Sequence, residues 1–247
     1  MTRKAQGYEP LHWSAENAAL LDQIVAQATG GGVAVFDLDG TLFDTRPRQV
    51  RIYREYAART GATSIFRVEA EHFRDWSISN TLRAAGVPEP VIAEHYEPLR
   101  KFWADRFFTS SYVRYDHAMP GAVELVKSVQ AGGMHVVYLT GRDQRMRGGT
   151  EDCLRDFGFP FGERGVTLLV KPTFEMDDTL FKEQAIEVLA QMGQIRLYLD
   201  NEPSNVNLFH ARHPAALVVF VETDHSPRPV VPDAGIPWLR SFLSAPV

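Results

Sequence analysis

Apolar residues in the second half of the chain form short runs that alternate with stretches of helical periodicity. Short runs rich in β-branched residues predict strands buried on both faces, which is typical of a parallel sheet. Strands alternating with helices predict an α/β fold with a Rossmann-like doubly wound parallel sheet. The predicted strands are 33–36, 135–139, 166–170, 195–199 and 216–221. Helices are expected after Pro120, around Leu154 and Phe157, and from a capping residue at Asp178.

The first half of the chain is mainly helical in pattern. Apolar positions over residues 11–29 recur at helical spacing and stop at a glycine triplet, so we expect a helix ahead of the first strand. Between residues 46 and 115 several helical patterns follow one another without a β-rich run. We therefore expect a core domain made of residues 1–45 and 116–247, interrupted by a helical domain of residues 46–115.

Composition narrows the class of protein. With 247 residues and 45% hydrophobic content, the chain can bury a substantial core. A net charge of -5 argues against nucleic acid as a partner, because affinity for phosphate backbones needs clustered Lys and Arg. Cys153 is the single cysteine, which excludes an intramolecular disulfide. The sequence contains neither a long apolar span nor the apolar core of a signal peptide, so we expect a cytoplasmic protein without a membrane partner. Oligomeric state is left open.

Two acidic residues follow the first predicted strand directly. Asp37 and Asp39 flank Leu38, so the period of two would place both carboxylates on one side of the chain as it leaves the sheet. Ligands bind at the carboxyl ends of the strands in open parallel sheets, which makes this edge the expected reaction centre. An Asp-Gly pair after an apolar run is also an ordinary turn signal, and the spacing alone leaves both interpretations open.

The order of polar segments along the chain carries more information than any one of them. Asp37-Leu38-Asp39-Gly40-Thr41 is followed by Thr140-Gly141-Arg142, then by Lys182, then by Asp200. This series resembles the four motifs of the haloacid dehalogenase superfamily of phosphatases and phosphotransferases, and the resemblance covers residues 33–205. It implies a Rossmann-like core with a helical cap, here residues 46–115, and Mg²⁺-dependent hydrolysis of a phosphate monoester.

The resemblance implies roles for the three acidic residues. Asp37 would attack phosphorus and form an aspartyl-phosphate, which divides one hard hydrolysis into two easier steps. Asp39 would protonate the leaving alcohol and later deprotonate the attacking water. Asp37, the backbone carbonyl of Asp39 and Asp200 would be the ligands of Mg²⁺, a hard cation that prefers oxygen. Asp39 also favours phosphate ester chemistry, because the carbon-halogen-cleaving branches lack an acid there.

The second and third motifs supply the expected contacts to substrate. Thr140 and the backbone amide of Gly141 can donate to phosphoryl oxygens, and Arg142 is a further candidate for substrate binding. Lys182 is expected to hold the transferring phosphoryl group with its positive charge. Lys171, in a Lys-Pro pair after the third strand, is the alternative for this role.

The fourth motif departs from the pattern of many relatives. Asn201 and Asn205 occupy positions where further acids would fall in that pattern, which leaves Asp200 as the acid expected to bind the metal. Asn201, Glu202 and Asn205 are candidate helpers in metal binding, and a weaker metal site is an open alternative.

Two clusters in the helical insertion have two interpretations each. Arg46, Arg48, Arg51 and Arg54 form either a solvated basic helix face or a site for a second anionic group on the substrate. An aromatic cluster is expected to form the core of the cap rather than a surface for stacking bases. Its members are Phe102, Trp103, Phe107 and Phe108.

Other functions remain open beside a phosphatase. A phosphotransferase or mutase would pass the aspartyl-phosphate to another hydroxyl, and a catalytically weak phosphate-binding regulatory module would use the same residues. The string Thr140-Gly141-Arg142-Asp143 also has some likeness to polynucleotide 3′-phosphatase domains, against which the negative net charge argues. We expect a phosphorylated small molecule as substrate, and no residue identifies which one.

Overall fold

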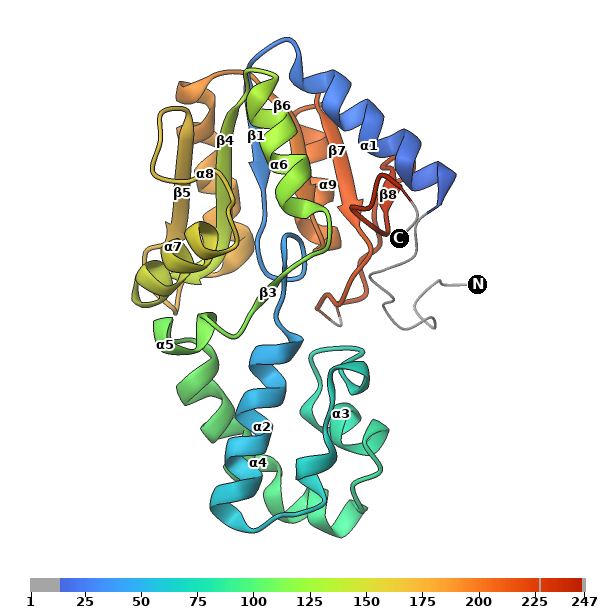
Figure 1. The fold of residues 1–247 in the computed structure, drawn as a ribbon, viewed down its shortest axis with the longest axis vertical. Helices are drawn as coiled ribbons and strands as arrows, with labels where there is room; N and C mark the ends of the chain where they lie inside the picture. The colour runs from blue at the N-terminus through green and yellow to red at the C-terminus, as the bar shows by residue number, and fades with distance from the viewer. Residues whose placement is uncertain (1–13, 227, 246–247) are drawn as a thin grey trace.

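A six-stranded parallel sheet forms the centre of the protein in a computed structural model that describes residues 14–226 and 228–245 (Figure 1). The strand order is β5-β4-β1-β6-β7-β8, and each neighbouring pair is parallel. The strands are β1 (Val33–Phe36), β4 (His135–Asp143), β5 (Val166–Lys171), β6 (Ile195–Asp200), β7 (Leu217–Val221) and β8 (Trp238–Leu239). The predicted Rossmann-like α/β fold is confirmed.

Helices cover both faces of this sheet. One face packs against α1 (Ala15–Ala28), α6 (Ala122–Ala131) and α7 (Arg147–Asp156), and the other against α8 (Asp178–Met192) and α9 (Pro203–Arg212). Strand β1 needs apolar cover on both faces of the sheet, because its alternate residues point to opposite faces. Ala34 and Phe36 belong to the first apolar cluster, whereas Val33 and Val35 belong to the second. All four residues of β1 are buried, as its uninterrupted apolar run predicts.

Two sequence expectations need correction. The N-cap of α8 is Asp177, whose carboxylate accepts from the Leu180 amide at 3.0 Å, and not Asp178. Asp178 instead begins the helix and pairs with Lys171. The start of the predicted helix 11–29 lies outside the described residues, and α1 begins after Ser14, whose hydroxyl accepts from the Asn17 amide at 3.1 Å.

Residues 46–113 form a helical lobe beside the sheet, joined to it through the short antiparallel strands β2 (Phe43–Asp44) and β3 (His117–Ala118) (Figure 1). Its main helices are α2 (Arg46–Thr60), α3 (Ile78–Ala84), α4 (Glu89–Phe107) and α5 (Ser110–Val113), with short 3₁₀ turns at Ile65–Arg67 and Ala70–His72. The lobe has an apolar cluster of its own that includes Tyr53, Phe73 and Leu99. In the part of the chain that the structure describes, no helix is long and apolar enough to cross a membrane.

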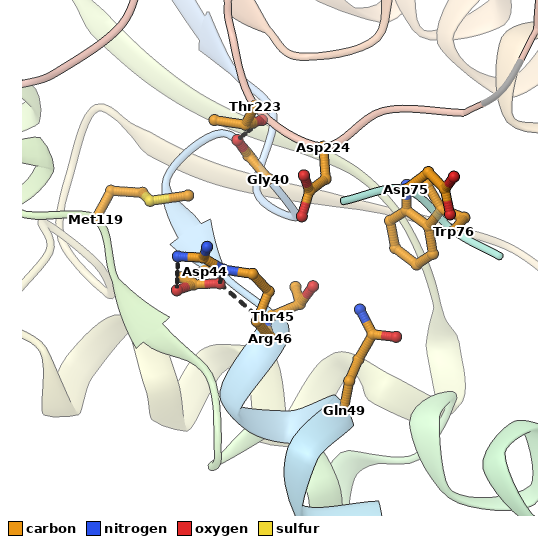
Figure 2. Close-up of a pocket in the computed structure, with 10 residues that line it drawn as sticks. All are labelled: Gly40, Asp44, Thr45, Arg46, Gln49, Asp75, Trp76, Met119, Thr223 and Asp224. Carbon is orange, nitrogen blue, oxygen red and sulfur yellow. Dashed lines mark hydrogen bonds and ion pairs between the residues drawn. The ribbon is translucent and has the colours of Figure 1, made fainter. Parts of the chain in front are cut away.

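A small pocket marks one point where the helical lobe meets the sheet domain. Figure 2 shows Asp75 and Trp76 from the lobe and Asp224 from the loop after β7 among the residues that line it. The guanidinium of Arg46 pairs with Asp44 at 2.7 Å in the same pocket. Burial raises the pKa of Asp224 to about 7; Arg46 opposes this rise, and the nearby Asp44 and Asp75 carboxylates add to it. Ionised Asp224 is therefore disfavoured in the folded protein.

We predict that Asp224→Asn stabilises the protein more at pH 8 than at pH 5. The folded state holds this proton more tightly than the unfolded chain, so stability from this group falls as pH rises from its ordinary pKa of 3.8 towards about 7. The substitution removes the ionised carboxylate, and the melting temperature at pH 8 should rise by about 2 °C or more. Thermal unfolding followed by circular dichroism measures this change. Asp22→Asn, on the exposed side of α1, is the control, and equal shifts at both pH values would contradict the prediction.

Candidate active site

Asp37 and Asp39 lie where β1 leaves the sheet. The Asp37 amide still donates to the Leu199 carbonyl at 2.9 Å, so the sheet fixes its backbone. The chain then turns at Gly40, which has φ of 78° and whose added Cβ would lie 2.2 Å from the side-chain nitrogen of Asn201. Conformation and space both require glycine there. The Thr41 hydroxyl donates to Asp37 at 3.1 Å and accepts from the Asn201 amide at 3.1 Å, which ties this turn to the loop after β6.

Lys182 joins three elements of the fold. From the second turn of α8 its Nζ donates to Asp37 Oδ1 at 2.7 Å and to Asp200 Oδ2 at 2.6 Å. Its side chain is only 4% exposed, so the ammonium and both carboxylates form a buried ion cluster. Lys171, the alternative considered from sequence, instead donates to Asp178 Oδ1 at 2.6 Å. The structure brings Lys182, and not Lys171, into contact with Asp37.

The charges of this cluster are unevenly balanced. Burial raises the pKa of Asp37 to about 7; Lys182 opposes the rise and Asp200 reinforces it. Burial alone would lower the pKa of Lys182, but Asp200 and Asp37 raise it, so the lysine stays charged. One cation faces two carboxylates, and a further cation beside Asp37 would lower its pKa and favour the ionised form.

Asp200 is fully buried at the end of β6. Besides Lys182, its carboxylate accepts from the Glu202 amide at 2.7 Å, from the hydroxyl of Tyr198 and from the Asn205 side chain at 3.1 Å. These donors fix the orientation of the carboxylate and provide hydrogen bonds to its oxygens without solvent. Sequence reasoning missed Tyr198, since a tyrosine inside a buried strand carries no signal beyond packing.

The three candidate metal helpers differ in what they contact. The Asn201 side chain donates to the Asp224 carbonyl at 2.6 Å, and Glu202 accepts from the amide and hydroxyl of Ser226. Asn205 donates to Asp200, but its buried Oδ1 has no hydrogen-bond partner. Of the three, Asn205 has an oxygen that a cation or its water could use.

Asp39 belongs to a second ion cluster. Its Oδ1 accepts from Arg142 Nε at 3.0 Å and from Arg48 Nη2 at 3.2 Å. Both arginines also pair with Asp116, Arg48 Nε at 2.8 Å and Arg142 Nη2 at 2.7 Å. Two guanidinium groups thus balance two carboxylates, and Arg48, Asp116 and Arg142 are at most 1% exposed in their side chains.

This second cluster sets the protonation of Asp39. Burial favours the neutral form, but the guanidinium groups of Arg142 and Arg48 lower the pKa of Asp39 below its ordinary value. The pKa of Asp116, in contrast, is raised to about 6 by burial despite the same two arginines. In this arrangement Asp39 is ionised at neutral pH.

The sequence alone does not predict that Arg48, Asp116 and Arg142 form this ion cluster with Asp39. Asp116 is a single acid at the end of the helical lobe, and no local pattern distinguishes it from a surface residue. Arg48 is fully buried, and its Nη1 also donates to the Phe107 carbonyl at 2.9 Å, so it is not part of a solvated face. Arg142, expected to bind substrate, has its donors directed to Asp39, Asp116 and Thr150.

The basic cluster predicted at the start of α2 does not form an anion site. Each of its arginines pairs with a carboxylate: Arg46 with Asp44, Arg48 with Asp39 and Asp116, Arg51 with Glu55 and Arg54 with Glu69. Among the described residues that line the cavity over Asp37, none is one of these four. The structure does not support the alternative in which these residues recognise a second anionic group on the substrate.

A cavity of about 310 Å³ lies over the two ion clusters. Its polar side comes from strand ends and helix starts: Asp37, Asp39, Thr140, Gly141, Arg142, Lys182, Asp200, Asn201, Glu202 and Asn205. Thr140 is 1% exposed, and its Oγ1 accepts from the Arg142 amide at 3.2 Å. The other side is formed by aromatic residues of the helical lobe: Trp76, Trp103, Phe107 and Phe108. All the site residues expected from sequence thus line one cavity.

The expected Mg²⁺ ligands fit a hard cation by their chemistry. Within residues 14–226 and 228–245 no group of three or more His, Cys, Asp or Glu is placed to hold a metal ion. The expected set has only two carboxylates, Asp37 and Asp200, completed by the backbone carbonyl of Asp39. The unpartnered Oδ1 of Asn205 adds an oxygen donor beside Asp200. Oxygen donors with net negative charge suit Mg²⁺.

A doubly wound sheet with polar side chains gathered at its carboxyl edge is the architecture of an α/β enzyme. A family model described as haloacid dehalogenase-like hydrolase matches residues 32–191. The chain belongs to this family, which confirms the resemblance seen in the sequence.

Solved structures with the same fold include a candidate phosphatase from Clostridium difficile and protein tyrosine kinase A from Mycobacterium tuberculosis. The first has a TM-score of 0.52 at 13% identity and covers 81% of this chain and 89% of its own. The second has a TM-score of 0.50 at 19% identity and covers 84% and 93%. At these identities the likeness concerns the fold alone. A search of curated proteins found no match.

We predict that Lys182→Met destabilises the protein far more than Lys171→Met. Without Lys182 two buried carboxylates face each other, and loss of a buried partner costs about 3 kcal/mol or more. Lys171 pairs with Asp178, whose side chain is 58% exposed, so its loss should cost less than about 1 kcal/mol.

Urea unfolding at pH 7.5 and pH 5 measures both losses. The Lys182→Met loss should shrink at pH 5, because protonation of Asp37, whose pKa burial raises, then removes the repulsion between the two carboxylates. Equal losses for the two lysine variants would contradict a structural role of the buried ion cluster.

Proposed function

We propose that this protein is a Mg²⁺-dependent phosphatase that hydrolyses a phosphate monoester through an aspartyl-phosphate on Asp37. The observation that carries the proposal is the contact of the Lys182 ammonium with both Asp37 and Asp200. Thr140 and Gly141 line the same cavity. A nucleophile, a fixed positive charge and hydrogen-bond donors at one point are what phosphoryl transfer requires.

The carboxylate of Asp37 is held for attack by two donors. Lys182 binds Oδ1, and the Thr41 hydroxyl binds Oδ2. In our proposal the phosphoryl oxygens accept from Thr140 Oγ1, the Gly141 amide and Lys182, which draws the phosphorus towards Asp37. A covalent aspartyl-phosphate forms as the alcohol leaves, and water then hydrolyses it.

Asp37, the backbone carbonyl of Asp39 and Asp200 would hold Mg²⁺, with Asn205 as a further oxygen donor. The ion supplies charge that offsets repulsion between the carboxylates and the phosphate. It also favours ionised Asp37, whose pKa burial otherwise raises to about 7.

Asp39 is proposed as the acid and base. Ionised Asp39, as held by Arg48 and Arg142, suits the removal of a proton from the attacking water. To protonate the leaving alcohol it must first bind a proton, which requires weaker contacts with the arginines. Arg48 belongs to the helical lobe, so a movement of the lobe relative to the sheet would weaken one of these contacts.

We further propose that residues 46–115 act as a cap over a core formed by residues 1–45 and 116–247. The lobe's aromatic side chains line the cavity opposite Asp37, where they exclude water from the reaction. The expected substrate is a phosphorylated small molecule, and the expected location is the cytoplasm, both on the grounds given by the sequence.

We predict that hydrolysis of an aryl phosphate requires Mg²⁺ and disappears in Asp37→Asn. The substitution keeps the size of the side chain and removes the nucleophilic charge, so turnover should fall by about 10³ or more. Release of inorganic phosphate, with and without a chelator, measures both effects. Asp152→Asn, on the exposed side of α7, is the control. If Asp37→Asn kept most of the wild-type turnover, the aspartyl-phosphate mechanism would be wrong, whereas a phosphorylated acceptor in place of phosphate would identify a phosphotransferase.

We predict that Asp39→Asn loses more activity on an alkyl phosphate than on a nitrophenyl phosphate. A nitrophenolate leaves with little protonation, whereas an alkoxide needs an acid. Asp44→Asn is the control, because Asp44 pairs with Arg46 and does not line the cavity in the described structure. It should affect both substrates alike. Equal losses for both substrates in Asp39→Asn would argue against the role in protonating the leaving group.

A further inference from the structure

The aromatic side of the cavity is not the core of the helical lobe. The lobe's apolar cluster is built from residues such as Tyr53, Phe73 and Leu99, and it includes neither Trp76, Phe107 nor Phe108. These three rings, with Trp103, line the cavity over Asp37 instead. The expectation that the aromatic cluster only forms the cap core is therefore wrong for Phe107 and Phe108.

The four rings form a continuous and rigid surface. Phe107 is buried and contacts each of the others: it stacks on Trp103 at 4.6 Å between centroids and meets Trp76 and Phe108 edge to face. The Arg48 guanidinium lies 3.9 Å from the Phe107 centroid and fixes the ring further. Trp76, Trp103 and Phe108 remain partly exposed, so the cavity receives aromatic surface from three rings that the fourth holds in place.

The cavity offers few cationic groups besides Lys182. Its cationic side chains within the described residues are Arg142, Lys182 and Arg228. Arg142 is held by Asp39 and Asp116, and Arg228 lies 3.9 Å from Asp177. A second phosphate or a carboxylate on the leaving group would have to compete with these carboxylates, whereas an uncharged group would not.

The aromatic surface also contains an unused donor. The indole Nε1 of Trp103 is buried and has no hydrogen-bond partner. A buried donor without an acceptor is costly, and a shift of the Trp103 ring that brought Nε1 to an acceptor on a bound molecule would remove that cost.

From these observations, and resting on the phosphatase activity proposed above, we propose that the substrate is a phosphate monoester whose leaving group carries an uncharged aromatic ring that packs against Trp76 and Trp103. A cavity of about 310 Å³ is in the size range of sites for small ligands. Stacking on aromatic side chains is the interaction that such a surface offers best. A nucleoside and a simple arylmethyl alcohol both carry an uncharged aromatic ring on the leaving alcohol. The experiment below distinguishes these two leaving groups.

The test uses esters matched in their leaving oxygen. Benzyl phosphate is compared with ethyl phosphate, and adenosine 5′-monophosphate with ribose 5-phosphate, so that each pair differs by a ring while the leaving group remains a primary alkoxide. With Mg²⁺ present, we expect kcat/KM to be at least about tenfold higher for the ring-bearing member, which corresponds to about 1.4 kcal/mol and agrees with base-aromatic stacking. A preference within the first pair alone identifies an arylmethyl phosphate, and one within the second pair identifies a nucleotide.

Substitutions in the aromatic surface then test whether its rings cause the preference for ring-bearing esters. Trp103→Leu should lower kcat/KM for the ring-bearing ester by about tenfold more than for its ring-free partner, since leucine keeps apolar bulk but loses the flat face. Trp76→Leu, on a different segment of the lobe, gives an independent measurement. Phe66→Leu is the control, because Phe66 is 51% exposed and is absent from the described lining of this cavity.

Two results would overturn the inference alone: equal kcat/KM within both pairs, or Trp→Leu losses that are the same with and without the ring. Absence of phosphate release from all four esters and from the aryl phosphate would instead overturn the proposed phosphatase function, and the inference with it.

Discussion

The structure depends on one buried interaction, the ammonium of Lys182 between the carboxylates of Asp37 and Asp200. It can form only when β1 and β6 are neighbours in the sheet and α8 packs on the face that Val33 and Val35 point to. The ion cluster therefore depends on the topology of the whole sheet. Burying three charges is costly, and the donors around Asp200 offset part of that cost. Lys182 leaves one negative charge beside Asp37 unbalanced. A divalent cation would balance this charge, and a phosphoryl group would bind to the hydrogen-bond donors around it.

A second buried ion cluster connects the two parts of the molecule. Arg48 comes from the helical lobe, Asp39 and Arg142 from the sheet, and Asp116 from the connection between them. The guanidinium groups of Arg142 and, from the lobe, Arg48 lower the pKa of Asp39, so the protonation of Asp39 depends in part on a residue of the lobe. Buried ion pairs contribute little net stability but make one arrangement much better than its alternatives. Here that arrangement is the placement of the lobe over the sheet.

Much of the fold and the location of the site could be predicted because both follow from local pattern. Apolar runs gave β1 and β6 nearly to the residue, and parallel strands bring their carboxyl ends to one edge, which gathered Asp37, Thr140 and Asp200. Asp116 and the partners of Arg48 could not be predicted, because their contacts join segments far apart in sequence and no short motif marks them. The cap of α8 was placed one residue late, since Asp177 and Asp178 are equally good caps by type and only the backbone distinguishes them.

The aromatic surface and Asp39, the proposed acid-base residue, are linked through one side chain. The guanidinium of Arg48 lies over the Phe107 ring, donates to the Phe107 carbonyl and donates to Asp39. Phe107 in turn supports the rings that face the cavity. A bound ring that displaced Phe107 would change the distance from Arg48 to Asp39, and with it the charge that holds the pKa of Asp39 low. In our proposal, the shape of the leaving group and the protonation of Asp39 are therefore coupled through Phe107 and Arg48.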